Sequence, residues 1–382
     1  MADVKIAVEA KQRATVFCPV SVELALPPEK VQGMALVDEQ RDAAVPAQVV
    51  VVDGRCRLHW ILESAAAGQV RNFTLTDAVE APESPYVDLT ELSGKVEIRI
   101  GGEFFSYYHS QQYVRPVLYP IIGPFGQGVT RAHPMEEVEN DHKDHPHHKS
   151  VWVAWGDVNG SDNWSEQEGH GSVVHRGFDD CEGGPVFGCI GTRNDWLDKA
   201  GNKLMDDCLV YRIYNLPGSA RFVEMDVTFK AGAKDVRFGD TKEGGICSVR
   251  VAAPMEADRG GRIENAYGGV NEDETWGKRA PWCDYSGTVG GHRVGICVFD
   301  HPSNLRYPTY WHVRNYGLMT ANPFGLSQFL APEKVDGSFV LPAGQSLAFR
   351  YAIFVHAGDA TEGGVRNRYL DWVFPPKTKV VV

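Results

Sequence analysis

Short segments in which apolar and polar residues alternate recur along the chain, and long helical periodicity is nearly absent. Residues 20–26 (VSVELAL) and 96–100 (VEIRI) show a period of two, which is typical of half-buried strands. The apolar run 47–54 ends in an Asp-Gly turn signal, and residues 55–62 continue at once as a second strand. We therefore predict a β-hairpin at this point.

More strands are expected beyond residue 86, with 40 glycines and 22 prolines to supply turns. A single amphipathic helix is predicted over 361–373, where Val365, Tyr369 and Trp372 fall near one face. Many strands without alternating helices predict an all-β fold, a sandwich or barrel rather than a parallel α/β sheet. The further expected strands are 95–100, 103–109, 150–156, 172–178, 185–194, 206–215, 221–231, 246–252, 293–299, 312–318 and 347–356.

The chain has 382 residues, more than one average domain. The segment Asp77–Pro85 carries acids and two prolines, as expected of a linker. We therefore predict a small β-sandwich-like domain at 1–85, followed by a large antiparallel β-sandwich domain at 86–382 that carries the functional site.

Composition excludes several classes of protein. A hydrophobic fraction of 43% with 23% charged residues indicates a globular chain with a real core. The net charge of -12 and the lack of a basic run argue against nucleic-acid binding. No apolar stretch is long enough for a membrane span, and the first residues lack the apolar core of a signal peptide. We expect a cytoplasmic protein, with a periplasmic location as the alternative if a signal has been removed.

The eight cysteines include no CxxC pair. In a chain without an export signal, this favours free, buried thiols over disulfides.

The densest chemical feature is the segment 144–164, which opens with His145, His147 and His148. Imidazole is a common metal ligand and titrates near neutral pH, so His145 and His147 are candidate ligands of a divalent ion and His148 a candidate base. On an extended chain His145 and His147 point one way and His148 the other. Asp157 and Asn159 suit hydroxyl recognition, and the alternative is a solvated, histidine-rich loop.

A second candidate group lies at 235–245, where Glu243 falls in a charged turn before a strand that carries Arg250. Acid and base types in one turn suit general acid–base catalysis, although an ordinary charged turn is an equal alternative. Arg115 and Arg131 are further basic candidates.

The long polar and aromatic segment 264–287 is a third candidate. Loops of this composition between strands commonly bind ligands, and tryptophan faces stack on sugar rings. The alternative is a structural loop whose tryptophans fill the core. The candidate substrate-binding residues here are Glu274, Trp276, Arg279, Trp282 and Asp284.

His312, on the expected strand 312–318, is a candidate acid. A lone strand histidine is more often a core residue, so its role depends on whether it meets the first histidines. The sequence has no GxSxG, Walker, HExxH or GxGxxG motif, which disfavours serine-hydrolase, ATP and NAD chemistry.

Several of these segments together resemble a bacterial family of unknown function, whose members often carry a label as a methane oxygenase subunit (PmoA-like). The matching motifs are RPVLYP, DHPHHKSVWVAWGDVNG, FGDTKEG, ETWGKRAPWCDYSG, FDHPSNLRYPTYWHVRNYG and ANPFG, in this order through residues 115–325.

The resemblance implies a β-sandwich similar to galactose mutarotases, with links to sugar and polysaccharide catabolism and to a sugar oxidoreductase as pathway partner. The oxygenase label does not fit, because that class is membrane-bound and this sequence has no spanning segment. Carried over by motif, the candidate site residues are His145, His147, His148, Glu243, Arg279 and His312.

The leading hypothesis is a carbohydrate-active enzyme that cleaves or rearranges a glycoside. Its substrate would be an oxidised (3-keto) sugar if the reaction is an acid–base elimination, and hydrolysis is the alternative reaction. His148 or Glu243 would serve as base and His312 as acid, while Arg115, Arg250 and Arg279 would stabilise oxygen anions. The alternatives are a non-catalytic carbohydrate-binding protein and a metal-dependent redox protein.

Overall fold

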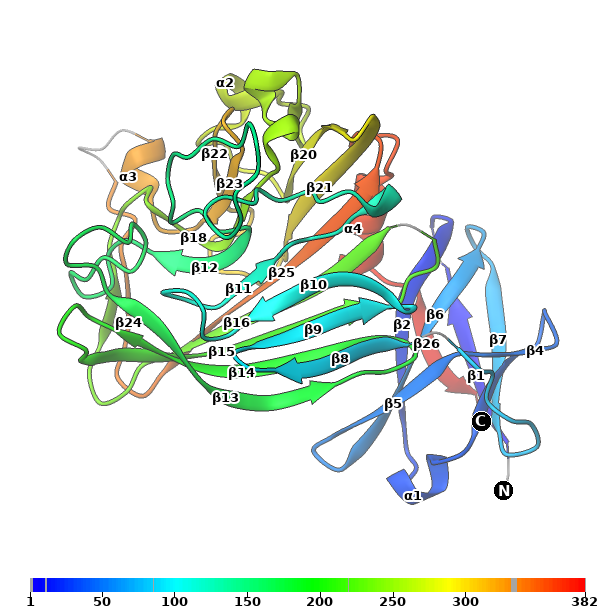
Figure 1. Cartoon of the computed structure of the whole chain (residues 1–382). Coiled ribbons are helices and arrows are strands. Elements are labelled where there is room, and N and C mark those ends of the chain that lie inside the picture. The colour runs from blue at the N-terminus through cyan, green and yellow to red at the C-terminus, as the bar shows by residue number, and fades with distance from the viewer. Residues whose placement is uncertain (1–2, 11, 85, 219, 331–334, 382) are drawn as a thin grey trace.

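Two large antiparallel sheets face each other in the computed structural model, which describes residues 3–10, 12–84, 86–218, 220–330 and 335–381 (Figure 1). The first sheet has the order β22(Tyr310–Val313), β23(Leu318–Asn322), β18(Gly244–Arg250), β12(Val151–Trp155), β11(Val117–Tyr119), β10(Glu103–His109), β9(Lys95–Ile100), β8(Val87–Leu92). The second has the order β13(Ser172–Glu182), β14(Phe187–Leu197), β15(Lys203–Tyr214), β16(Arg221–Lys230), β25(Ser346–Ala357), β21(His292–Asp300), β20(Trp282–Val289), β19(Arg262–Asn265).

The main core lies between these two sheets, and strand alternation decides which side chains enter it. On β16, Val223 and Met225 point into the core, whereas Phe222 points to the other side of the sheet. On β12, Val151 and Trp155 point inward. A β-sandwich results because each sheet buries one apolar face against the other. The predicted all-β antiparallel sandwich is therefore confirmed.

Residues before β8 form two smaller sheets with their own core around Trp60 and Phe73. One has the order β26(Lys377–Val381), β1(Val4–Glu9), β7(Val70–Thr76), β3(Ala35–Asp38), β4(Ala43–Val45), and the other β2(Thr15–Leu24), β6(Arg55–Ala65), β5(Ala47–Val52). The last strand of the chain thus pairs with the first, and the N and C labels lie side by side in Figure 1. The division into two domains at residue 85 stays a prediction. The last strand, β26, returns from the large sandwich to the sheet that contains β1.

The predicted hairpin is present, since β5 pairs with β6 across Asp53 and Gly54, which have φ of 50° and 75°. Positive φ at both positions is the geometry of a type I′ turn, which explains the Asp-Gly signal. The single strand expected over 312–318 is wrong: β22 and β23 form a hairpin there, and Gly317 turns the chain with φ of 100°.

Helices are short and peripheral. The predicted C-terminal helix is present as α4(Val365–Val373), which packs on the outer side of the second sheet (Figure 1). The other short elements are α1(Pro28–Val31), η1(Pro124–Gly126), β17(Val236–Phe238), η2(Ala253–Met255), η3(Ala257–Arg259), α2(Asn271–Thr275), α3(Leu326–Phe329) and β24(Phe339–Leu341).

All eight cysteines are free thiols, five of them buried and three partly buried. Among the described residues, no helix has the length and apolar character to cross a bilayer.

Candidate active site

The histidine-rich segment covers the outer face of the first sheet. Trp152 on β12 points away from the main core, and it packs with Tyr119, Leu318 and Trp164 in a separate apolar cluster. Trp164 comes from the segment after β12, so this cluster fixes that segment against the sheet. The site is therefore built on a rigid strand surface.

The three histidines gather their rings together. The imidazoles of His145 and His148 are stacked with centroids 4.8 Å apart, and the ring of His147 lies 4.3 Å from that of His148. The expectation that His148 points away from the other two is wrong. It assumed an extended chain, whereas His145 has φ of 42° and its carbonyl accepts a hydrogen bond from the His148 amide at 2.9 Å. A turn therefore replaces the strand geometry.

Arg131 holds this turn in shape. Its side chain is fully buried, and its guanidinium donates to the carbonyl oxygens of Asp144 at 2.9 Å and His145 at 2.8 Å. It also donates to the carbonyls of His142 and His148. A guanidinium group has several N–H donors in a fixed plane, so it can donate hydrogen bonds to several carbonyl oxygens that have no partner in a strand. Arg131 acts as a scaffold residue.

Arg250 links the histidines to two carboxylates. Its buried guanidinium donates to Oδ1 of Asp144 at 3.0 Å and lies 3.5 Å from Oε1 of the buried Glu256. Its Nη1 also donates to Nδ1 of His148 at 3.3 Å. Burial raises the pKa of Asp144, but the hydrogen bond from His145 and the charges of Arg250 and Arg131 hold that pKa well below its usual range. The network therefore keeps Asp144 ionised.

His148 stays neutral at ordinary pH. Burial, and next the electrostatic effects of His147 and of the positively charged Arg250, hold its pKa well below the usual histidine value. Burial likewise lowers the pKa of His147 to about 4.

Glu243 and His312 meet at the other side of this site. Nδ1 of His312 donates to the Lys242 carbonyl at 2.8 Å, which fixes the ring beside the Glu243 turn. Within the described chain Nε2 of His312 has no hydrogen-bond partner. Burial lowers the pKa of His312 to about 4, against the raising effect of the Glu243 carboxylate.

The Glu243 carboxylate connects His312 electrostatically with His147. Burial raises its pKa, but the hydrogen bond and charge of Lys242, and then the charges of His312 and His147, lower it below the usual range. Its side chain is 47% exposed, so solvent or a ligand can reach it. Glu243 is thus an accessible carboxylate that interacts electrostatically with both histidines.

The turn that presents Glu243 is rigid. Nδ2 of Asn322 donates to the carbonyls of Thr241 and Lys242, each at 3.1 Å. A Cβ at Gly244 would lie 2.4 Å from the ring of Trp155, so only glycine fits after Glu243.

Tyr316 is a site residue that the sequence reasoning missed. Its ring stacks on His145 at 5.1 Å, and the Arg250 guanidinium lies 4.8 Å from the ring centroid. Burial raises its pKa to about 12, so the phenol stays protonated. Asp144 and Glu256 were missed too. Asp144 and Tyr316 lie within the family motifs quoted above, which is the signal that could have pointed to them.

Arg115 does not face the accessible part of the site. It is 1% exposed, and it donates to Glu166 at 2.8 Å and to the Trp164 carbonyl at 3.0 Å. Its role in the structure is to hold the covering segment.

Asp157 and Asn159 lie at the far end of β12 from His148. Oδ2 of Asp157 pairs with Arg237 at 3.2 Å, and Oδ1 of Asn159 accepts from the Arg237 amide at 2.7 Å. Both close a turn, and the structure does not bring them to the histidines.

Trp282 and Asp284 lie on the opposite side of the sandwich. Trp282 belongs to the cluster between the second sheet and α4. Asp284, two residues on and facing the same side, is fully buried and pairs with Nε2 of His356 at 2.8 Å. The expectation that both join the histidine site is corrected by the strand alternation of β20.

The remaining candidates of the loop flank β22. Glu274 caps the Val270 amide at 2.9 Å, Trp276 packs edge-on against Phe329 at 5.4 Å, and Arg279 donates to the Pro308 carbonyl at 2.8 Å. They lie beside the strand that carries His312, and each has a structural partner.

The structure does not gather a metal-binding set from the described residues: no group of three or more His, Cys, Asp or Glu side chains there is arranged to hold an ion. His145 instead directs Nδ1 to Oδ2 of Asp144 at 2.5 Å. The metal role of His145 and His147 stays a prediction.

An antiparallel β-sandwich with a buried arginine–carboxylate network and clustered imidazoles on one outer face defines the class of this protein. The chain belongs to a family of unknown function (DUF6807), whose model matches residues 95–369. That span contains every residue of the histidine site described above.

No curated protein sequence is significantly similar to this chain. Among solved structures, a protein in glycosyl hydrolase family 38 from Enterococcus faecalis has a TM-score of 0.46 at 10% identity, covering 100% of this chain and 47% of that one. An α-galactosidase from Lactobacillus brevis has a TM-score of 0.32 at 9% identity, covering 74% and 40%. The chain thus spans less than half the length of either protein.

Proposed function

We propose that this protein is an enzyme that acts on a sugar or glycoside by acid–base catalysis, with Glu243 and His312 as the catalytic pair. The observation that carries the proposal is an accessible Glu243 carboxylate beside His312, whose Nδ1 bonds to the Lys242 carbonyl at 2.8 Å, with lowered pKa values for Glu243, His312 and His147. Perturbed titratable groups that converge on one surface are typical of active sites.

The charge states favour removal of a proton from the substrate. At neutral pH Glu243 is a carboxylate, and Nε2 of His312 carries a free lone pair because Nδ1–H is committed to the Lys242 carbonyl. Both groups can accept a proton. His148 is only 1% exposed and supports the site from within: Arg250 donates to its Nδ1, so the imidazole proton must be on Nε2.

Two proton acceptors on one surface suit a sugar whose ketone acidifies the neighbouring C–H bond. Glu243 removes that proton, the C–H electrons form the enolate, and loss of the glycosidic oxygen from the next carbon completes the elimination. The departing oxygen takes a proton relayed through His312. The resemblance to proteins linked with sugar oxidoreductases agrees with an oxidised substrate.

Turnover measurements on paired substrates test this function. Purified protein is assayed on a panel of 3-keto glycosides and on the parent glycosides, together with Glu243→Gln and His312→Asn. We expect turnover of a keto glycoside, and a loss of about 10²-fold or more in kcat/KM for each variant. Glu103→Gln, an exposed carboxylate on β10 of the same sheet, is the matched control and keeps full activity.

Three results would contradict the proposal. Turnover by both variants at the wild-type rate would remove Glu243 and His312 from the chemistry. Sugar binding without turnover of any glycoside would favour a carbohydrate-binding protein. Activity that requires a bound transition metal, measured on protein purified without a His tag, would favour the metal-dependent alternative.

A further inference from the structure

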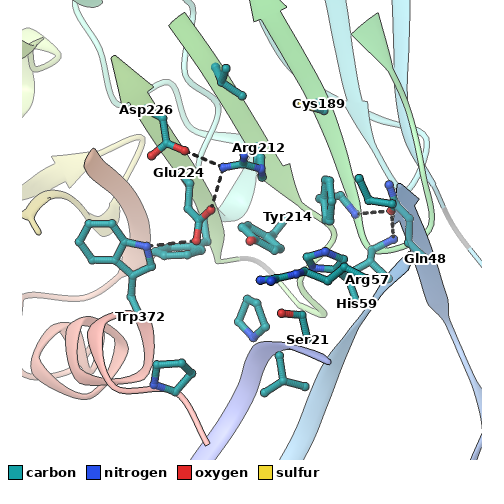
Figure 2. Close-up of a pocket in the computed structure, with 18 of the residues that line it drawn as sticks. Ser21, Gln48, Arg57, His59, Cys189, Arg212, Tyr214, Glu224, Asp226 and Trp372 are labelled. Atoms are coloured by element: carbon teal, nitrogen blue, oxygen red, sulfur yellow. Dashed lines mark hydrogen bonds and ion pairs between the residues drawn. The ribbon is translucent and has the colours of Figure 1, made fainter. Parts of the chain in front are cut away.

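A large cavity lies on the other side of the sandwich from Glu243 and His312. It has a volume of about 1370 Å³ and opens between the strands β2, β5 and β6 and the outer face of the second sheet (Figure 2). Tyr211 and Met225 point into the main core, so their neighbours Arg212 and Glu224 point into this cavity. The main core therefore separates it from Glu243 and His312.

A row of charged side chains forms the floor of the cavity. Arg212 pairs with Asp226 at 2.8 Å and lies 3.5 Å from Glu224, while Arg350 pairs with the other oxygen of Asp226 at 3.1 Å. Nε1 of Trp372, on α4, donates to Glu224 at 3.1 Å. The antiparallel register of β15, β16 and β25 fixes this row, because Arg212 lies opposite Glu224 and Asp226 opposite Arg350.

The opposite wall belongs to the first sheets of the chain. Ser21, Gln48, Arg57 and His59 face the charged row across the space in Figure 2. Oε1 of Gln48 accepts hydrogen bonds from the amides of Val186 at 3.2 Å and Phe187 at 3.1 Å, and these bonds tie the two walls together. The width of the cavity is thereby set by direct contacts between the walls.

The chemistry of the lining favours a neutral, polyhydroxylated ligand. Each of the four lining arginines has a protein partner: Arg212 and Arg350 pair with Asp226, Arg57 lies 3.8 Å from Glu23, and Arg368 donates to the carbonyls of Phe17 and Val16. Burial lowers the pKa of His59 to about 4, and this histidine adds no charge at neutral pH. Paired carboxylates and guanidinium groups keep spare lone pairs and N–H donors that match vicinal hydroxyls. Tyr214 and Trp372 add aromatic surface.

The size excludes a single small metabolite as the best fit. Pockets for drug-sized ligands are roughly 300–1,000 Å³, and this cavity exceeds that range. A chain of several sugar units is long enough to follow the charged row and to reach both walls.

We propose that this cavity binds a neutral oligosaccharide, as a second carbohydrate site distinct from the one around Glu243. It does not depend on the proposed function, because binding here requires none of the residues proposed for catalysis.

Calorimetric titration with cellohexaose, xylohexaose and maltohexaose tests the proposal. We expect at least one of them to bind wild type, and Glu243→Gln and His312→Asn to retain that binding. The isosteric variant Asp226→Asn removes the shared counter-ion of Arg212 and Arg350, and it is expected to weaken binding at least tenfold. Ser21→Trp fills the cavity from the opposite wall, leaves the charged row intact, and is expected to abolish the same binding event.

Glu103→Gln is the control, and thermal melts of every variant check that the fold is kept. The proposal is overturned if none of the three hexasaccharides binds at millimolar concentration, or if binding survives both Asp226→Asn and Ser21→Trp. A cavity for polycations would also overturn it. In that case spermine binds wild type, Asp226→Asn and Ser21→Trp abolish that binding, and the hexasaccharides do not bind.

Discussion

Nη1 of Arg250 donates a hydrogen bond to Nδ1 of His148 at 3.3 Å, and the direction of this bond decides where the imidazole proton lies. Arginine can only donate, so Nδ1 must be the acceptor and Nε2 carries the hydrogen. Burial lowers the pKa of His148 most, and the same guanidinium lowers it further, so the ring stays neutral. One buried arginine therefore sets the tautomer of this histidine and adds to the effect of burial on its charge.

Arg250→Ala is expected to destabilise the fold strongly. The side chain is fully buried between Asp144 and the buried carboxylate of Glu256, so its loss leaves negative charge without its main partner. Removal of one member of a buried ion pair costs about 3–5 kcal/mol. Urea unfolding followed by circular dichroism measures the change. Arg259→Ala, which removes a partly exposed partner of the same Glu256, is the control and is expected to cost about 1 kcal/mol or less. Equal costs for both variants would contradict this account.

Lys242→Met is expected to move the acid limb of the pH–activity profile upward. Lys242 lowers the pKa of Glu243 by hydrogen bond and charge, so its removal lets burial raise that pKa. A base with a higher pKa is protonated at a higher pH, and activity is then lost sooner as the pH falls. The measurement is kcat/KM between pH 4 and pH 8 on the keto glycoside turned over best. Lys203→Met, on the second sheet, leaves the profile unchanged if the effect is local. An unmoved acid limb in Lys242→Met would exclude Glu243 as the titrating base.

The pH dependence of stability tests the burial of His312 directly. Its pKa is about 4 in the folded protein and about 6.5 in an unfolded chain. Between these values the unfolded state binds the extra proton, so His312 contributes less stability as the pH falls from 6.5 towards 4. We expect the unfolding free energy of wild type, relative to that of His312→Gln, to fall by up to about 3 kcal/mol as the pH falls from 6.5 to 4. Urea titrations at four pH values measure it, and a constant difference would show that His312 titrates normally.

The sheet architecture could be predicted from the sequence because strand alternation is a local property. Most of the expected strands are present, and the Asp53–Gly54 turn is where its residue types indicate. The pairing of β26 with β1 could not be foreseen, since it joins the two ends of the chain and depends on packing alone.

The site was predictable in its parts and less so in its assembly. His147, His148, Glu243 and His312 were named from residue type and motif, and the structure places them on one outer face of the first sheet. The orientation of His148 was missed because the left-handed conformation of His145 breaks the expected strand. Tyr316 was missed because nothing in its local sequence indicates that its ring stacks on His145.

The predicted role of Asp284 differs most from its position in the structure. Its residue type and loop suggested contact with substrate, yet it is buried against His356 behind the main core. The pKa of His356 is raised by the Asp284 charge and hydrogen bond, which act against its burial. Asp284→Ala removes that partner, and we expect a loss of about 3–5 kcal/mol in unfolding free energy.

The same substitution is expected to leave the chemistry alone. Because Asp284 lies across the core from Glu243, kcat/KM of Asp284→Ala stays within about twofold of wild type when assayed well below its melting temperature. Differential scanning calorimetry and steady-state kinetics on one preparation separate the two effects. A large fall in kcat/KM with an unchanged melting temperature would mean that Asp284 contacts the substrate, and that the working surface is on the second sheet rather than around Glu243 and His312.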